Sequence, residues 1–227
     1  MERYAIIHEK FPREFILLQG TGCRWGKCEF CDYHNDIGEN PFEINKTVLS
    51  RVTGQYGVLD VINSGSAIEL DDDTIELIKN VAIEKSIHTL WFEMHYMYRY
   101  HLGNFAKRFA PILVKFRCGV ESFDGEMREK WKKGIAKDVS EKEVAEFFDG
   151  VCLLCGTEGD SKQRILNDIS LAKANFEYAS VNLFNENSTA IKADKNLQKW
   201  FIENVYQNLK DDSQIEVLIN NTDLGVG

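Results

Sequence analysis

Short runs of apolar residues recur along the chain and predict β-strands. Six runs are rich in Val, Ile, Leu and Phe, as the strands of a buried sheet usually are. They cover residues 15–19, 58–63, 88–94, 112–120, 151–155 and 178–184. The segments that separate or follow these runs place apolar residues three or four positions apart, which is the spacing of a helix. The predicted helices cover residues 73–84, 124–133, 162–175 and 196–209.

The alternation of strands and helices predicts the fold class. Consecutive strands that are joined by helices pair in parallel through right-handed crossovers, which gives an α/β fold. Six such units form a partial (β/α)6 barrel of parallel strands, with its chemistry at the carboxyl ends of the strands. A chain of 227 residues with no internal repeat and no linker is expected to form one domain over residues 1–227.

Charge and apolar segments limit the kinds of partner. With 27 basic and 36 acidic residues, the net charge of −9 opposes docking on the phosphate backbone of nucleic acid. We therefore expect a small-molecule substrate and no nucleic-acid partner. The chain shows no signal peptide and no apolar run of about 18 residues, so we expect no membrane contact and a cytoplasmic location. The six cysteines are then expected to be buried or to bind a metal rather than to form disulfides.

Three of the cysteines, Cys23, Cys28 and Cys31, follow the first predicted strand within nine residues. Three thiolates on one loop can bind a single inorganic centre, and a [4Fe-4S] cluster with three cysteine ligands keeps one iron open. The alternative is a structural zinc site, which needs four ligands and would take His34 as the fourth. The loop lies where a barrel places its catalysis, which favours the cluster.

The cysteine loop resembles the signature of the radical S-adenosylmethionine (SAM) superfamily. In that signature three and then two residues separate the cysteines, and an aromatic residue precedes the last one, as Phe30 does here. This chain has four residues, 24–27, between its first two cysteines, and variant spacings occur in the superfamily. The resemblance implies that a [4Fe-4S] cluster binds SAM and cleaves it to a 5'-deoxyadenosyl radical, which abstracts hydrogen from a small substrate.

Further segments extend the resemblance over most of the chain. Ser64-Gly65-Ser66, after the second predicted strand, is similar to the glycine-rich turn that receives the methionyl amino group, with serines in place of two glycines. Residues 116–123 and 181–184 are similar to two strands of the coproporphyrinogen-oxidase-like branch. By this resemblance the SAM-binding residues are Phe30, Ser64, Gly65, Ser66, Glu93, Glu121, Lys133 and Asn182.

The resemblance also implies roles for the side chains of this set. Glu93 and Glu121 would hold the ribose or methionine part of SAM, and Lys133 its carboxylate. Phe30 and Asn182 would lie near adenine. The alternative for Glu121 and Lys133 is an ion pair on the surface, which is common and contributes little.

The remaining cysteines, Cys118, Cys152 and Cys155, are expected to be buried apolar side chains. Residues three apart on a strand point to opposite faces, so Cys152 and Cys155 cannot chelate one metal from a continuous strand. Unligated cysteine is also among the most buried residue types.

Histidine and tyrosine residues follow the third predicted strand. His95 shares a strand face with Glu93, so it either contacts the substrate or is a hydrogen-bonded structural residue. Tyr96, Tyr98 and Tyr100 are expected to pack beyond the strand end with their hydroxyls in water, and the alternative is that they form a stacking wall.

Arg24 and Lys27 lie between two cluster cysteines, with Lys10 and Arg13 shortly upstream, in an otherwise acidic chain. Such a basic patch is suited to steer an acidic electron donor, flavodoxin or ferredoxin, to the cluster. The alternative is that they are ordinary solvated charges.

The whole chain resembles the small bacterial radical SAM lyases of queuosine salvage, which cleave the deazaguanine queuine to recover its aminomethyl precursor. A lyase reaction on queuine is therefore the predicted function. A deazaguanine presents amino and ring N–H donors, and a carboxylate is the matching acceptor. The candidates near loop ends are Glu43, Glu158, Asp160 and Glu186.

Two other functions stay open at this point. A glycyl-radical-enzyme activase is similarly small but acts on a protein loop, for which it needs an open groove. A binding module stabilised by a metal is the alternative that is not an enzyme.

Overall fold

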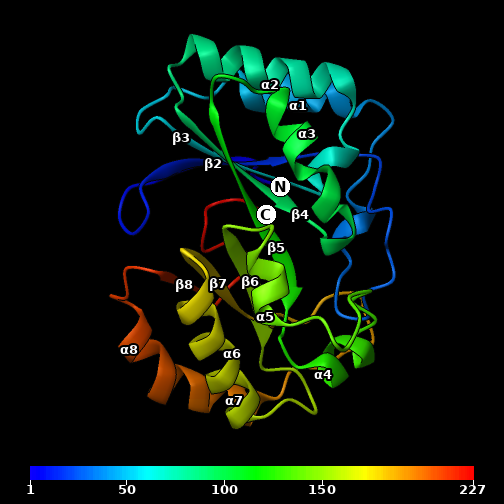
Figure 1. Cartoon of the computed structure of the whole chain (residues 1–227), viewed down its shortest axis with the longest axis vertical. Coiled ribbons are helices and arrows are strands. Elements are labelled where there is room, and N and C mark those ends of the chain that lie inside the picture. Colours follow the sequence, from blue (N-terminus) through cyan, green and yellow to red (C-terminus); the bar gives the residue numbers. More distant parts are fainter. The chain divides into compact units, whose positions relative to one another are not determined.

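The computed structural model describes all residues, 1–227, and contains an eight-stranded sheet whose strands follow one another in chain order (Figure 1). The six predicted strands are present as β2 (Arg13–Leu18), β3 (Val58–Asn63), β4 (Thr89–Met94), β5 (Leu113–Glu121), β6 (Gly150–Cys155) and β7 (Tyr178–Leu183). β2 pairs in parallel with β3, β3 with β4, and β6 with β7. The predicted α/β class and the strand order of a partial barrel are confirmed.

Two strands that the sequence analysis did not predict extend the sheet at its edges. β1 (Tyr4–Ile7) pairs antiparallel with β2, and β8 (Ile215–Leu218) pairs in parallel with β7. Both have only four residues. A run of that length is too short to show the apolar pattern by which a strand is recognised.

The predicted helices are also present. They are α2 (Asp72–Glu84), α4 (Gly125–Lys130), α6 (Lys162–Asn175) and a continuous stretch made of α7 (Lys195–Phe201), the π-turn η4 (Ile202–Tyr206) and α8 (Gln207–Leu209). The Asp71 side chain accepts a hydrogen bond from the Thr74 amide at the start of α2. Such a cap satisfies a backbone N–H group that the first helical turn leaves open.

Three short helices were not predicted from the sequence: α1 (Pro41–Leu49), α3 (Leu102–Lys107) and α5 (Glu141–Ala145). Short 3-10 turns, η1 (Tyr33–Asn35), η2 (Ala67–Glu69) and η3 (Tyr96–His101), lie in the loops. None of the helices is long and apolar enough to cross a membrane.

The chain divides into two compact units, each built from separate segments. The first unit contains Met1–Gly26, Tyr33–Arg117 and Thr222–Gly227, and the second contains Lys27–Asp32 and Cys118–Asn221. The boundary passes through β5 and through the cysteine loop. Cys23 therefore belongs to the first unit, whereas Cys28 and Cys31 belong to the second. A single domain over residues 1–227 stays a prediction.

Helices cover the sheet within each unit. In the first unit α1 and α2 lie side by side, and α1 packs against β2 (Figure 1). In the second unit α6 packs on β6 and β7. The buried residues Ile75 and Ile78 of α2, and Ile165 and Ile169 of α6, are three or four positions apart. This spacing places them on one face of each helix, which is the face that joins the core.

The first unit also holds a buried ion-pair network that links three strands. Asp60 on β3 accepts hydrogen bonds from Arg13 Nε on β2 at 2.9 Å and from both terminal nitrogens of Arg117 on β5 at 2.7 and 2.8 Å. The side chains of Arg13 and Arg117 are 4% exposed, and that of Asp60 is 2% exposed. A buried guanidinium group is tolerated only beside an anion, so both arginines depend on Asp60. Because Arg13 is buried in this network, the prediction that it contributes to a basic surface patch is wrong.

Asp60→Ala is expected to lower the free energy of unfolding by about 3–5 kcal/mol, because it leaves two buried guanidinium groups without their carboxylate. Urea denaturation of the purified protein measures the loss. Asp72 is the matched control, since it also pairs with an arginine but its side chain is 87% exposed. Asp72→Ala is expected to cost less than about 1 kcal/mol. Equal losses in the two variants would contradict the role assigned to Asp60.

Candidate active site

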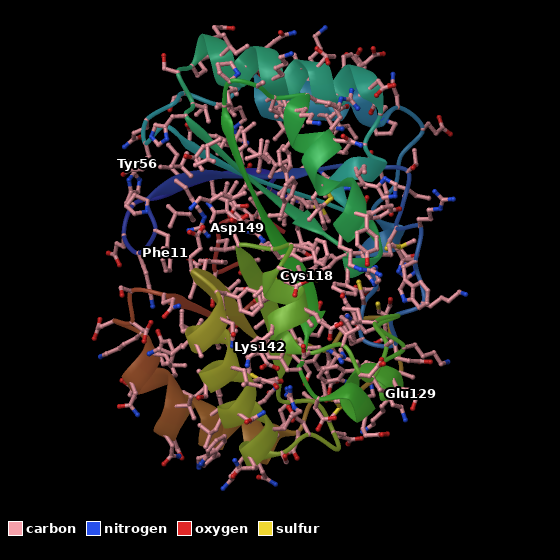
Figure 2. All side chains as sticks on the ribbon, in the orientation of Figure 1. Phe11, Tyr56, Cys118, Glu129, Lys142 and Asp149 are labelled. Atoms are coloured by element: carbon pink, nitrogen blue, oxygen red, sulfur yellow. The ribbon has the colours of Figure 1, made fainter.

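Three cysteines are buried on strands, as predicted. Cys118, which is labelled in Figure 2, lies on β5, and Cys152 and Cys155 lie on β6. Because β6 continues through both of its cysteines, they cannot chelate one metal. Burial raises the pKa of Cys155 well above its ordinary value, so this thiol stays protonated at neutral pH.

The loop that follows β2 carries Cys23, Cys28 and Cys31, which are half-buried and form no disulfide. Three accessible thiols on one loop fit a [4Fe-4S] cluster that keeps one iron open. The structure gathers no group of three or more His, Cys, Asp or Glu side chains in the arrangement of a metal site. The cluster therefore stays a prediction, supported by the type and exposure of its three ligands.

In the first unit, the cysteine loop lies directly against the turn that follows β3. A Cβ atom on Gly65 would lie 3.0 Å from the Gly22 carbonyl oxygen and 3.1 Å from Cys23 Cα. Only glycine allows the backbone to come so near without displacing the loop. Gly65 thus permits a close backbone approach, here by the protein's own loop, and its contact with SAM stays a prediction.

The two serines of this turn use their hydroxyls to fix the neighbouring strand ends. Ser64 Oγ accepts a hydrogen bond from the Gly20 amide at 3.1 Å, and Ser66 Oγ accepts one from the His95 amide at 2.9 Å. Both serines are 3% exposed. The turn after β3 is therefore tied to the residues that follow β2 and β4, at the carboxyl ends of the strands where such folds place their chemistry.

Glu69 was not among the residues predicted from the sequence, and its carboxylate joins the turn, the cysteine loop and a tyrosine. Glu69 Oε2 accepts a hydrogen bond from the Ser66 amide at 3.1 Å, and both carboxylate oxygens lie 3.4 Å from the Arg24 amide nitrogen. Tyr98 donates its hydroxyl to Oε1 at 2.7 Å. Burial and this carboxylate raise the pKa of Tyr98 to about 12. The signal that locates Glu69 in the sequence is the capping-box spacing from Ser66.

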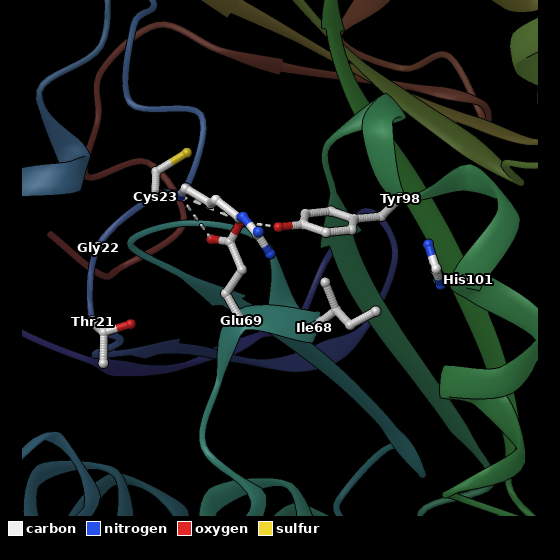
Figure 3. A pocket seen from close by; sticks show the side chains of 8 residues that line it. Thr21, Gly22, Cys23, Ile68, Glu69, Tyr98 and His101 are labelled. Carbon is white, nitrogen blue, oxygen red and sulfur yellow. Dashed lines mark hydrogen bonds between the residues drawn. The ribbon is translucent and has the colours of Figure 1, made fainter.

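These contacts border a cavity in the first unit with a volume of about 630 Å³. Figure 3 shows the Glu69 carboxylate between the backbone beside Cys23 and the Tyr98 hydroxyl. Tyr98 is 9% exposed, so the expectation that its hydroxyl lies in water is wrong. The lining residues are Thr21, Gly22, Cys23, Arg24, Ile68, Glu69, Tyr98 and His101. A cavity of this size is large enough for a small-molecule ligand.

His95 has a structural environment. Its ring stacks on Trp25, with the ring centroids 5.7 Å apart and the planes inclined by 20°. Its Nδ1 accepts a hydrogen bond from the Met97 amide at 3.1 Å, and the residue is 8% exposed. The interpretation of His95 as a hydrogen-bonded structural histidine is the one that the contacts support.

In the second unit, three predicted cofactor residues lie together. Lys133 Nζ donates a hydrogen bond to Glu121 Oε1 at 3.0 Å and lies 5.7 Å from the centroid of the Phe30 ring. Burial alone would lower the pKa of Lys133, but Glu121 and Cys28 raise it well above its ordinary value, so the ammonium stays charged. The side chains of Lys133 and Glu121 are 9% and 10% exposed. The alternative of a surface ion pair is therefore wrong.

The backbone of Glu121 has an unusual conformation, and Phe30 is held by contacts with its neighbours. Glu121 ends β5 with φ of 65°, which residues other than glycine rarely adopt and which is found most often at functional sites. Phe30 packs edge-to-face on Trp131 with centroids 5.7 Å apart, and its carbonyl accepts a hydrogen bond from Asn187 Nδ2 at 2.8 Å. Both predicted residues are thus fixed by contacts within the second unit.

The other two predicted cofactor residues lie in different surroundings. Glu93 on β4 pairs with Arg117 at 3.4 Å, and its side chain is 37% exposed. Asn182 on β7 is half-buried and donates a hydrogen bond to Ser180 Oγ at 3.4 Å. A role in SAM binding stays a prediction for both residues.

One of the four acidic candidates for the deazaguanine is already engaged by the protein. Asp160 forms a buried ion pair with Arg164. Glu43, Glu158 and Glu186 are exposed. A ligand would have to displace Arg164 to use Asp160, so the three exposed carboxylates are the better candidates.

No protein-family model matches the chain, and no curated protein matches it significantly. Among solved structures, a queuine lyase from Clostridium spiroforme bound to SAM and queuine is similar to it with 42% sequence identity and a TM-score of 0.94. The match covers 100% of this chain and 99% of that chain. Identity of this size over the full length shows a common family and not only a common fold. The chain is therefore an enzyme and belongs to the family of radical SAM queuine lyases.

Proposed function

We propose that this enzyme binds SAM and queuine and cleaves queuine to its aminomethyl deazaguanine precursor. The observation that carries the proposal is the 42% identity, over the whole chain, to a queuine lyase whose structure holds both molecules. A fold alone does not determine a substrate, so the proposal also depends on what the residues of this site can do.

The residues that would hold the [4Fe-4S] cluster are Cys23, Cys28 and Cys31, the half-buried set of thiols in the chain. A bound cluster, once reduced by the electron donor, would supply the electron that cleaves SAM to methionine and a 5'-deoxyadenosyl radical able to abstract hydrogen from the substrate. The protein's own contribution is to hold SAM and the substrate in the relative orientation that the reaction needs and to exclude water.

Lys133 is the residue best suited to the carboxylate of SAM. Its ammonium group donates a hydrogen bond to Glu121, and its side chain is almost fully buried. The raised pKa keeps the charge in place. A buried cation attracts an anion more strongly than a solvated one does, because the surrounding dielectric constant is lower. Phe30 lies beside this cation and offers its ring to the adenine.

The Gly65 turn is suited to the methionyl amino group. It is tied to the ends of β2 and β4 by Ser64 and Ser66, and it presents backbone rather than side chain to an approaching ligand. For the deazaguanine, the exposed carboxylates of Glu43, Glu158 and Glu186 are acceptors that no buried ion pair engages.

Replacing any one of Cys23, Cys28 and Cys31 by Ala is expected to abolish cluster binding, because the cluster needs all three thiolates. Cys118→Ala and Cys152→Ala are the matched controls and are expected to keep about four irons per chain. Iron and sulfide analysis of anaerobically reconstituted protein measures both. The assignment of a single cluster would be contradicted if the wild type held zinc in place of iron. It would also be contradicted if a control variant lost as much iron as the variants of Cys23, Cys28 and Cys31.

Queuine incubated anaerobically with reconstituted protein, SAM and reductant is expected to be consumed, with formation of 5'-deoxyadenosine and an aminomethyl deazaguanine. An analogue without the ring N–H donors is expected to react about 10- to 100-fold more slowly, because it loses hydrogen bonds to a carboxylate. Mass spectrometry of the reaction measures all products. If a glycyl-radical partner protein raises the 5'-deoxyadenosine output and queuine does not, the activase function replaces this one.

The electron donor is proposed to be an acidic flavodoxin or ferredoxin that approaches the exposed Arg24 and Lys27. Changing both to Ser is expected to slow flavodoxin-driven turnover about tenfold at low salt, and less at high salt, because the attraction is screened. Dithionite-driven turnover is expected to fall less, because dithionite does not dock on the patch, although Arg24 also lines the cavity. The variant with Lys107→Ser and Lys199→Ser, two exposed lysines, makes the same change in net charge elsewhere. Equal losses with both reductants would rule out steering.

A further inference from the structure

We propose that Glu69 and Tyr98 are positioning residues for the first cluster ligand, Cys23, and act on it through the Arg24 amide. This inference rests on the proposed function, because it takes Cys23 as a ligand of the cluster. Neither side chain was assigned a role by the sequence pattern, and neither needs to touch the cluster or the substrate to act in this way.

The hydrogen bonds place the Glu69 carboxylate at the centre of this arrangement. Both of its oxygens lie 3.4 Å from the amide nitrogen of Arg24. That nitrogen belongs to the peptide bond that leaves Cys23, so its direction determines the orientation of the cysteine backbone. The carboxylate is itself held from two sides, by the Ser66 amide at 3.1 Å and by the Tyr98 hydroxyl at 2.7 Å.

The loop approaches the turn closely because residue 65 is a glycine. A Cβ atom at that position would lie 3.1 Å from Cys23 Cα, so only glycine leaves room for the loop there. The carboxylate of Glu69 attracts the adjacent amide, and this opposes movement of the loop away from the turn. Trp25, which follows Arg24, stacks on the buried His95. The segment after Cys23 is therefore held by a charge-assisted hydrogen bond and by a ring contact.

Tyr98 determines which way the carboxylate faces. A carboxylate on a flexible side chain can rotate away from a weak donor, and a backbone amide at 3.4 Å is a long contact. The Tyr98 hydroxyl holds Oε1 at a short distance, and Tyr98 is itself 9% exposed. Tyr98 thus orients the Glu69 carboxylate, and the carboxylate in turn holds the loop at the Arg24 amide. A metal ligand needs placement to within about 0.5 Å, which supporting hydrogen bonds of this kind provide.

The first experiment measures the loop in the full-length protein before cluster reconstitution. Amide hydrogen exchange of residues 21–26 is expected to be about tenfold faster in Glu69→Ala, the factor that corresponds to one hydrogen bond to a charged group. Glu69→Gln, which keeps an acceptor oxygen, is expected to lie between Glu69→Ala and the wild type. Tyr98→Phe is expected to speed exchange as well. Tyr100→Phe is the matched control, because Tyr100 is 70% exposed on the same 3-10 turn, and it is expected to leave exchange unchanged.

The second experiment uses the reconstituted protein and needs no substrate. Glu69→Ala and Tyr98→Phe are expected to lose iron to a chelator about tenfold faster than the wild type and to change the electron paramagnetic resonance spectrum of the reduced cluster. Glu69→Gln is expected to lose iron at a rate between those of the wild type and Glu69→Ala, and Tyr100→Phe is expected to keep the wild-type spectrum. This ranking of the variants supports the positioning role, since a general loss of stability would not produce it.

The outcomes separate this inference from the proposed function. Wild-type exchange, iron retention and spectrum in Glu69→Ala, with only a lower melting temperature or a higher KM for SAM, would overturn the positioning role and leave the function standing. A wild-type protein that takes up no iron would overturn the proposed function, and the inference would fall with it. A wild-type protein that holds a cluster but does not cleave queuine overturns only the substrate, because neither experiment contains one.

Discussion

The backbone of the cysteine loop lies against the turn after β3 at Gly65, and the contacts between Glu69 and this loop depend on the close approach. The Gly22 carbonyl oxygen and Cys23 Cα lie 3.0 and 3.1 Å from the place where a Cβ atom of residue 65 would stand, so any side chain there would push the loop away. In this arrangement both oxygens of Glu69 lie 3.4 Å from the Arg24 amide nitrogen. The absence of a side chain at Gly65 therefore permits the position of the first predicted cluster ligand within its unit.

The second unit relies on a buried cation instead. Taking Lys133 and Glu121 out of water is costly, and an apolar pair of similar size would often be at least as stable. The pair therefore contributes little to stability, and its value lies in the charge that it keeps inside the protein. Glu121 also carries a positive φ, which costs further free energy. A charged group that is kept at such cost suits the anionic end of a small ligand such as SAM.

Local patterns in the sequence were enough to predict six strands, four helices and the grouping of three cysteines on one loop. Long apolar runs predicted six strands correctly, and the four-residue strands β1 and β8 had too little pattern to be found. The site itself depends on contacts between distant positions. Tyr98 and Glu69 are 29 residues apart, and Asp60 and Arg117 are 57 apart. A single sequence gives no reason to pair them, because each partner alone is compatible with a solvated surface.

Glu93 connects the stabilising network to the predicted cofactor site. Arg117 places both terminal nitrogens on Asp60 and turns Nε toward Glu93 at 3.4 Å. That contact is long for a hydrogen bond, and more than a third of the Glu93 side chain is exposed. Arg117 thus orients Glu93 without engaging it as fully as it engages Asp60. A carboxylate in this state can still accept hydroxyl donors of the kind that a ribose presents. Because Asp60 holds Arg117 in place, the same buried pair that stabilises three strands also sets the direction of Glu93.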